Sequence, residues 1–139
     1  MRTLLRPVLV SFVLAAGPAL AGAKANHEPG TSVEMPYLIA PVIVDGQLYA
    51  NAYVSSKIVA TSPAATIVVR DKLPFIQDAY VRQVNGVPVG RASDPKTVDI
   101  PALTARLLAE AKRVVGANYI DSVEIIRVQM SPLRGAAPG

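Results

Sequence analysis

Apolar and polar residues recur with two different periods along this chain, and the two periods predict strands first and helices afterwards. Residues 37–44 (YLIAPVIV) are almost continuously apolar, whereas residues 47–60 alternate between apolar and polar positions. Asp45 and Gly46 separate these two runs and predict a tight hairpin. Pro41 cannot donate a ladder hydrogen bond, so the first strand is expected at a sheet edge or with a bulge.

The second predicted strand buries one face and leaves the other half polar. Tyr49 and Tyr53 fall on the face opposite the apolar positions Leu48, Ala50, Ala52 and Val54. Such alternation is typical of an antiparallel sheet that carries helices on one side only. Tyrosines on the open side of a sheet can mark an interface, or they can pack against neighbouring strands. The sequence leaves both interpretations open.

Residues 62–84 predict the helix around which the other elements are expected to assemble. Ser62 suits an N-cap and Pro63 the first helical position. Apolar residues then recur every three or four positions, at Val69, Leu73, Ile76, Tyr80 and Val84. Pro74 removes a backbone hydrogen bond inside this pattern, so a kink or a restart is expected near residues 72–73.

A second helix and a closing strand follow a loop at residues 87–96, which is expected to hold one short extended piece. Asp99 suits an N-cap and Gly116 a helix stop. The buried face of this helix is predicted to comprise Ile100, Leu103, Leu107, Ala111 and Val114. Residues 119–130 predict the last strand, in which the adjacent Ile125 and Ile126 indicate a bulge or burial on both faces.

The predicted fold class is therefore α+β, with a small antiparallel sheet, the element order β-β-α-α-β and two helices packed on one face. The folded domain is expected at residues 37–130. Residues 22–36 are polar with Pro and Gly, and we expect a flexible mature N-terminus there. Residues 131–139 are expected to form a disordered tail.

Residues 1–21 have the form of a secretory signal peptide, which predicts export to the periplasm. Arg2 and Arg6 precede the apolar run LVSFVLAA, and Ala19-Leu20-Ala21 resembles a cleavage site. An uncleaved membrane anchor is the alternative, although the apolar run is shorter than the roughly 20 residues that a span requires. Removal of this segment lowers the basic residues from 14 to 12 against 10 acidic ones. The remaining formal charge of +2 gives no reason to expect nucleic-acid binding.

Candidate catalytic or metal-binding groups are scarce. The chain has no cysteine and one histidine, His27, so disulfides, thiolate chemistry and nucleophilic triads are not expected. Asp71 and Asp78 have basic neighbours, as ordinary surface pairs do. The VNGVPVG stretch lacks the spacing of a phosphate loop. We therefore expect no enzyme activity, no cofactor and no metal.

Basic residues on the two helices offer a second candidate surface. Together with Tyr49 and Tyr53, the candidate partner-binding residues are Arg70, Lys72, Arg82, Arg106 and Arg113. Acidic residues are interspersed among them, so a solvated helical face is the simpler interpretation. The alternative is a docking surface for an acidic partner or a weak contact with anionic lipid head groups.

The chain resembles the periplasmic domain of the FliL family of flagellar basal-body-associated proteins over residues 41–130. The matching positions are Pro74, Ile76, Asp78 and Ala79, then Leu103, Leu107 and Leu108, and finally the strand 123–128. The resemblance implies a stomatin-like fold and a role in assembly around a membrane partner, such as the motor's stator, without catalysis. The family typically has an N-terminal membrane helix, where this chain has a signal-like segment, and a short helical turn where this chain has the loop 87–96.

These observations predict a non-enzymatic periplasmic protein that binds a protein partner at the inner membrane or envelope, with homo-oligomerisation left open. A flagellar motor or another envelope complex is the expected setting. The alternative function is a small-molecule or lipid carrier, for which the apolar first strand and the helices would enclose a pocket.

Overall fold

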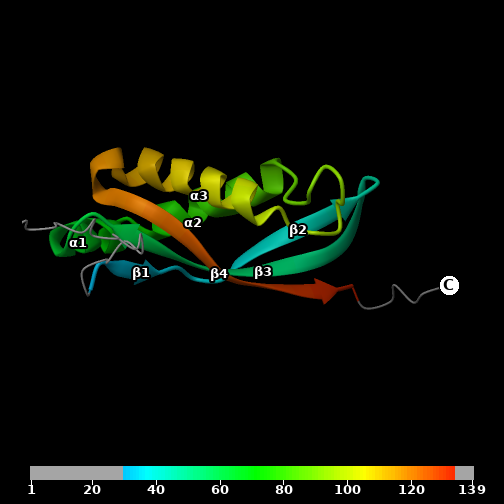
Figure 1. Ribbon diagram of the computed structural model, residues 1–139, viewed down its shortest axis with the longest axis horizontal. Coiled ribbons are helices and arrows are strands. Elements are labelled where there is room, and N and C mark those ends of the chain that lie inside the picture. Colours follow the sequence, from blue (N-terminus) through cyan, green and yellow to red (C-terminus); the bar gives the residue numbers. More distant parts are fainter. Residues whose placement is uncertain (1–29, 134–139) are drawn as a thin grey trace, which may run out of the picture.

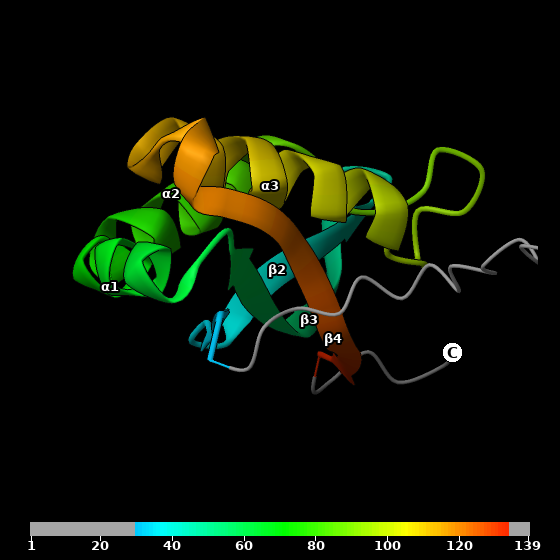
Figure 2. The ribbon, with the colours of Figure 1, turned by 60° about the vertical axis from the view of Figure 1, so that its left-hand side comes forward.

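The computed structural model describes residues 30–133 and confirms an α+β fold with a small antiparallel sheet. The elements, in chain order, are β1 (Ser32–Glu34), β2 (Leu38–Val44), β3 (Gln47–Ala60), α1 (Pro63–Asp71), α2 (Leu73–Gly86), α3 (Ile100–Val115), the 3-10 turn η1 (Ala117–Tyr119) and β4 (Ile120–Pro132). The helices lie together on one side of the sheet (Figure 1). Figure 2 shows the same arrangement from another direction, with β4 crossing beside β3.

Strand β3 is the centre of the sheet. β1 and β2 pair end to end along one edge of β3, and β4 pairs along the other edge, every pair being antiparallel. Between β1 and β2, the Met35 N–H donates to the Ser56 carbonyl at 2.9 Å, so the edge is nearly continuous. The central element is therefore β3 rather than the helix that follows Ser62.

The predicted hairpin and edge strand are both present. Asp45 and Gly46 have φ values of 51° and 77°, the left-handed backbone that a two-residue type I′ turn requires. Pro41 lies in β2, an edge strand, and a register shift follows between Val42 and Ile43. A proline is tolerated here because only one side of an edge strand is hydrogen-bonded.

The helix boundaries follow local capping signals. The Ala65 N–H donates to Ser62 Oγ at 3.0 Å, and the Ala102 N–H donates to Asp99 Oδ1 at 3.1 Å. The expected restart near Pro74 is confirmed, because α1 ends at Asp71 and α2 begins at Leu73. α3 ends at Val115 and is capped by Gly116, whose φ of 113° is accessible to glycine at little cost.

The core lies between the helices and the inner face of the sheet. Its largest fully buried side chains are Leu38, Val42, Val54, Ile58, Val69, Ile76, Tyr80, Val84, Val89, Leu103 and Leu107. The loop between α2 and α3 contributes Val89, and it contains the expected extended piece as a single bridge between Gly90 and Val98. Two predicted core positions, Leu48 and Ile100, are instead exposed. Leu48 is displaced by the register shift near the hairpin, and Ile100 stands in the first turn of α3.

The predicted flexible segment 22–36 is wrong for its last part. Residues 32–34 form β1, and Val33 and Met35 are buried against the core, which orders this part of the chain. The predicted tail is also corrected at its start, because Ser131 and Pro132 still pair with β3. The signal-like segment 1–21, residues 22–29 and residues 134–139 lie outside the described residues. In the part that is described, no helix is both long and apolar enough to cross a membrane.

Candidate functional site: the open face of the sheet

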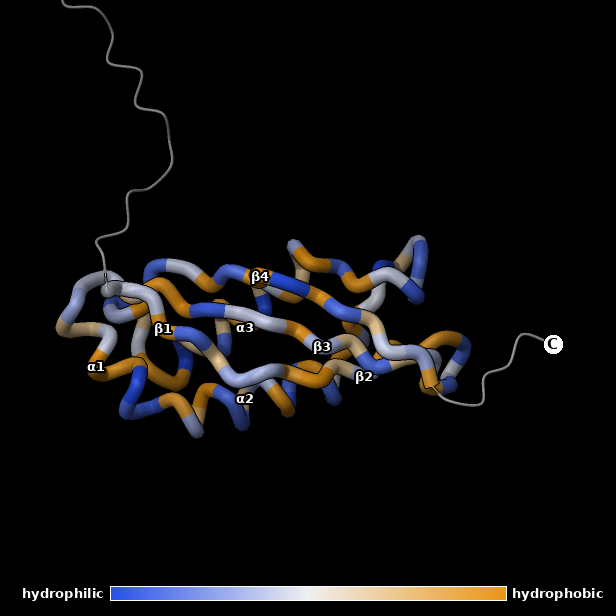
Figure 3. Tube along the Cα trace, turned by 90° about the horizontal axis from the view of Figure 1, so that it is seen from below, coloured by the Kyte–Doolittle hydropathy of each residue, from blue (hydrophilic) through white to orange (hydrophobic). Residues whose placement is uncertain are grey.

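The side of the sheet that faces away from the helices forms a broad surface (Figure 3). Strand register places its residues in rows that cross the strands. These rows are Glu34–Lys57–Glu124, Ile39–Tyr53–Gln129 and Pro41–Asn51–Ser131. Within residues 30–133 no helix packs on this side, so no described helix covers this face of the sheet.

Apolar and aromatic side chains occupy the middle of this face. Tyr37 is 71% exposed, Ile39 50%, Tyr53 38% and Ile126 58%. We call these four residues the open-face patch. They come from the β1–β2 connection, β2, β3 and β4, so the patch extends across the full width of the sheet. Scattered exposed apolar residues are normal, but several gathered on one uncovered face are typical of an interaction site.

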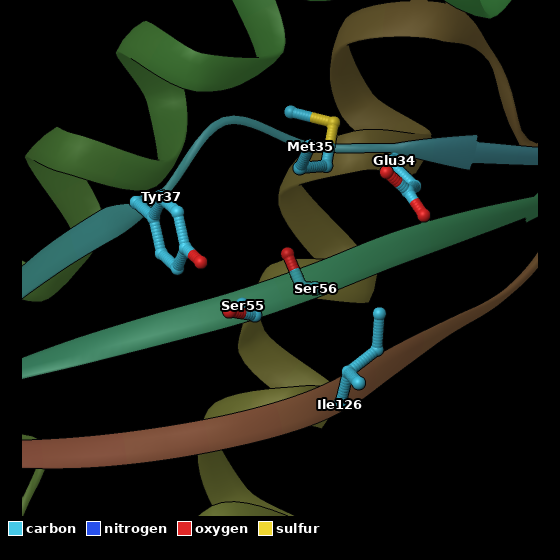
Figure 4. A pocket seen from close by; sticks show the side chains of 6 residues that line it. All are labelled: Glu34, Met35, Tyr37, Ser55, Ser56 and Ile126. Atoms are coloured by element: carbon cyan, nitrogen blue, oxygen red, sulfur yellow. The ribbon is translucent and has the colours of Figure 1, made fainter.

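A hollow of about 240 Å³ lies inside this region, where β1 gives way to β2. Figure 4 shows Tyr37 and Glu34 at its two ends, Ser55 between them and Ile126 on the neighbouring strand. Met35 and Ser56 complete the lining. The Ser56 side chain is buried, and its Oγ has no hydrogen-bond partner among the described residues. The hollow therefore offers polar groups beside an apolar patch.

Charges on the open face are balanced. Lys57 stands between Glu34 and Glu124 in its row, and its Nζ lies 2.9 Å from Glu124 Oε2. Arg127 lies opposite Ser55, one row closer to the patch. Two basic and two acidic side chains thus border the apolar centre. An interface with an apolar centre and a polar rim has this composition.

The two predicted tyrosines do not share this site. Tyr53 faces Ile39 and belongs to the open-face patch. Tyr49 lies at the register shift, because Val42 pairs with Ala50 and Ile43 pairs with Leu48, which leaves Tyr49 opposite no residue of β2. The Lys96 Nζ lies 5.3 Å from the centre of the Tyr49 ring, a cation–π contact with the loop between α2 and α3.

Three of the five predicted basic residues come together on the helical side. Lys72, Arg82 and Arg113 line a hollow of about 340 Å³ with Phe75, Asp78 and Val114. Arg82 pairs with Asp78 at 2.7 Å, and Arg113 pairs with Glu110 at 2.5 Å. Lys72 Nζ lies 5.4 Å from the centre of the Phe75 ring. Asp78 and Glu110 offset the charges of the two arginines, and the Phe75 ring leaves the charge of Lys72 uncompensated, so this hollow carries only a small excess of positive charge.

The other two basic residues lie apart from that hollow. Arg70 is exposed on α1. Arg106 is half-buried on α3 and donates from Nη2 to the Pro88 carbonyl at 3.2 Å, which ties the loop to the helix. The seven predicted residues therefore form no single surface: Tyr53 lies on the open face, Lys72, Arg82 and Arg113 lie together on the helical side, and Tyr49, Arg70 and Arg106 lie elsewhere.

Most residues of the open face were missed from the sequence. In the run 37–44, the residues expected on the two faces of the strand are both apolar. The sequence could therefore not show that Ile39 points outward while Leu38 and Ala40 are buried. Glu34 lies in a segment predicted to be flexible. The alternation in residues 47–60 did indicate one further open-face residue, because Lys57 lies four positions after Tyr53 and therefore on the same face of the strand.

Shifted titratable groups lie away from the open face. Burial raises the pKa of Tyr80, which lies in the core. The Thr97 hydroxyl donates to Asp94 at 2.6 Å and lowers the pKa of that exposed carboxyl. In residues 30–133 no group of three or more His, Cys, Asp or Glu side chains could hold a metal ion. What the open face offers chemically is contact area and hydrogen bonds.

No protein-family model and no curated protein matches this chain.

Proposed function

We propose that this chain is a non-enzymatic exported protein of the FliL-like type, which acts through protein–protein contacts at a flagellar motor or another envelope complex. The resemblance over residues 41–130 and the signal-like segment 1–21 support the setting. The observation that carries the proposal is the open-face patch of Tyr37, Ile39, Tyr53 and Ile126, which no described helix covers.

The composition of the face favours a protein partner with an apolar surface. Tyrosine and isoleucine bury large areas, and tyrosine does so at a small cost in side-chain entropy. Anionic lipid surfaces and nucleic acids are bound mainly by net positive charge. Glu34 and Glu124 offset Lys57 and Arg127 on this face, so the attraction must come from apolar contact with hydrogen bonds at the rim.

The carrier alternative draws less support from the shapes of the hollows. A carrier encloses most of its ligand's surface. The hollows lined by Tyr37, by Phe75 and by Leu48 have volumes of about 240, 340 and 270 Å³, and each opens at the surface between exposed side chains. Such hollows fit the contact surface of a partner better than an enclosed ligand.

Photo-crosslinking in intact cells tests the proposal. A photoreactive amino acid is placed at Ile39 or at Tyr53, and the matched control is placed at Ile67, an exposed isoleucine of α1 on the helical side (61% exposed). We expect both open-face positions to capture the same envelope protein, identified by mass spectrometry, and Ile67 not to capture it. Equal capture at Ile67, or no adduct at Ile39 and Tyr53, would overturn the proposal.

The identity of the captured protein distinguishes the two settings. A stator or basal-body component, together with reduced swimming of a deletion strain, would support the flagellar role. Capture of another envelope protein with unchanged swimming would keep the interaction role and place it in a different complex.

A further inference from the structure

The outer edge of β4 is the longest open strand edge in the described part of the molecule. β4 comprises 13 residues, and within residues 30–133 it pairs with β3 alone. The β1–β2 edge on the other side is interrupted between residues 34 and 38. An edge strand presents unpaired N–H and C=O groups that can pair with another strand. Natural edges are usually short, charged or bulged for this reason; β4 carries a bulge and charged residues but is long.

The pattern of charged and apolar residues along this edge is complementary to that of a second β4 strand running in the opposite direction. A bulge lies at Ile126, because Ser56 pairs with Ile125 while Ser55 pairs with Arg127. The bulge brings Glu124 and Arg127 to the same face of the sheet, one on each side of the exposed Ile126. Arg127 makes no ion pair with a described residue. A strand with an acidic and a basic residue placed symmetrically about an apolar centre fits an antiparallel copy of itself.

We propose that two copies of this chain pair antiparallel along β4, with Glu124 of each copy facing Arg127 of the other. In this register Val123 faces Val128 and Ser122 faces Gln129. Each of these pairs joins residues on the same face of the sheet, as antiparallel pairing requires. The Ile125 and Ile126 positions of the two copies meet at the centre, between two Glu–Arg pairs.

This pairing joins the sheets into one continuous sheet. The two-fold axis stands perpendicular to the sheet, so the open faces of both copies lie on the same side and the two open-face patches become neighbours. Glu124 keeps its contact with Lys57 at 2.9 Å and adds Arg127 of the second copy. The dimer goes beyond the proposed function and does not depend on it, because Tyr37, Ile39 and Tyr53 of the open-face patch take no part in the pairing and Ile126 alone of the four lies at the β4 edge.

Sedimentation equilibrium on the protein, purified in the form in which it accumulates in cells, tests the pairing. Two variants, Arg127→Glu and Glu124→Lys, each replace both Glu–Arg pairs of a homodimer by like charges. Each variant alone is expected to weaken dimerisation about tenfold or more. An equimolar mixture of the two variants restores both opposite-charge pairs, so the mixture should dimerise with an affinity close to that of the unmodified protein.

Thermal unfolding of each variant shows that it is folded, and Arg113→Glu serves as a control for a charge reversal on the helical side. Three results would overturn the pairing: an unmodified protein that stays monomeric to about 1 mM, unchanged dimerisation in Arg127→Glu, or no restoration in the mixture. Restored affinity in the mixture would support this register specifically. Loss of crosslinking at Ile39 with dimerisation intact would refute the partner proposal alone.

Discussion

Tyr80 lies in the core with a hydroxyl that no residue of the described range 30–133 hydrogen-bonds, and its replacement by Phe is expected to stabilise the protein. Its side chain is fully buried, and its hydroxyl has no hydrogen-bond partner among the described residues. Phe keeps the ring and its packing against the core and removes only the oxygen. A buried hydroxyl without a partner costs about 1–3 kcal/mol relative to its hydrated state. Tyr80→Phe should therefore raise the free energy of unfolding at pH 7 by about 1–2 kcal/mol.

The pH dependence of stability provides an independent check on the same group. Burial raises the pKa of Tyr80 above its ordinary value of 10.0. Because the folded-state pKa exceeds the unfolded one, the tyrosine ionises first in the unfolded chain, so the free energy of unfolding is independent of this group below pH 10 and falls as the pH rises above 10. One group in this situation reduces stability by about 1.4 kcal/mol for each pH unit. The Tyr80→Phe variant should lack this part of the alkaline slope.

Urea unfolding at pH 7 and at several values between pH 9.5 and 11.5 measures both effects. Tyr53→Phe, at an exposed tyrosine of the open face, is the matched control and should change neither quantity by more than about 0.5 kcal/mol. A Tyr80→Phe variant that is less stable by 1 kcal/mol or more, or that keeps the full alkaline slope, would refute the reasoning. The first result would mean that the hydroxyl forms a hydrogen bond in the folded protein, and the second that folding does not raise the pKa of Tyr80.

Three further substitutions test local features of the fold by the same unfolding measurement. Ser62→Ala removes the acceptor for the Ala65 N–H and should cost about 1 kcal/mol. Gly90→Ala should cost about 1–3 kcal/mol, because a Cβ there would clash with the Pro95 carbonyl oxygen; Gly86→Ala, where nothing lies within 4 Å, should be far milder. Leu107→Ala opens a cavity in the core and should cost about 2–5 kcal/mol. Unchanged stability in any of the three destabilising variants would contradict the corresponding contact.

The features that the sequence predicted correctly depend on neighbours in the chain. Ser62 and Asp99 cap helices by accepting a hydrogen bond from the backbone N–H three positions later. Pro74 lies in the first turn of α2, where the helix restarts. Asp45 and Gly46 form the hairpin from their own backbone preferences. Because these signals are local, the element order and the helix restart could be predicted from the sequence.

The features that were missed depend on residues far apart in the chain. β1 has three residues, and it is ordered by pairing with residues 57–59, which also pair with β4, and by burial of Val33 and Met35 against the core. Register shifts beside Val42 and Ser55 change which face a side chain occupies, and they account for the exposed Leu48 and for the position of Arg127. The open-face patch combines residues from β2, β3 and β4, so it could not be identified before the strands were paired.

Because the chain has no cysteine, a single introduced cysteine can test directly whether a partner covers the open face. Single substitutions Ile39→Cys and Ile67→Cys each introduce one thiol, on the open face and on the helical side respectively. The rate of maleimide labelling is measured in intact cells and on the purified protein. We predict that Ile39→Cys is labelled at least about fivefold more slowly in cells than after purification, whereas Ile67→Cys is labelled at equal rates; fivefold corresponds to about 80% occupancy of the site. Equal rates for Ile39→Cys in cells and after purification would contradict the account.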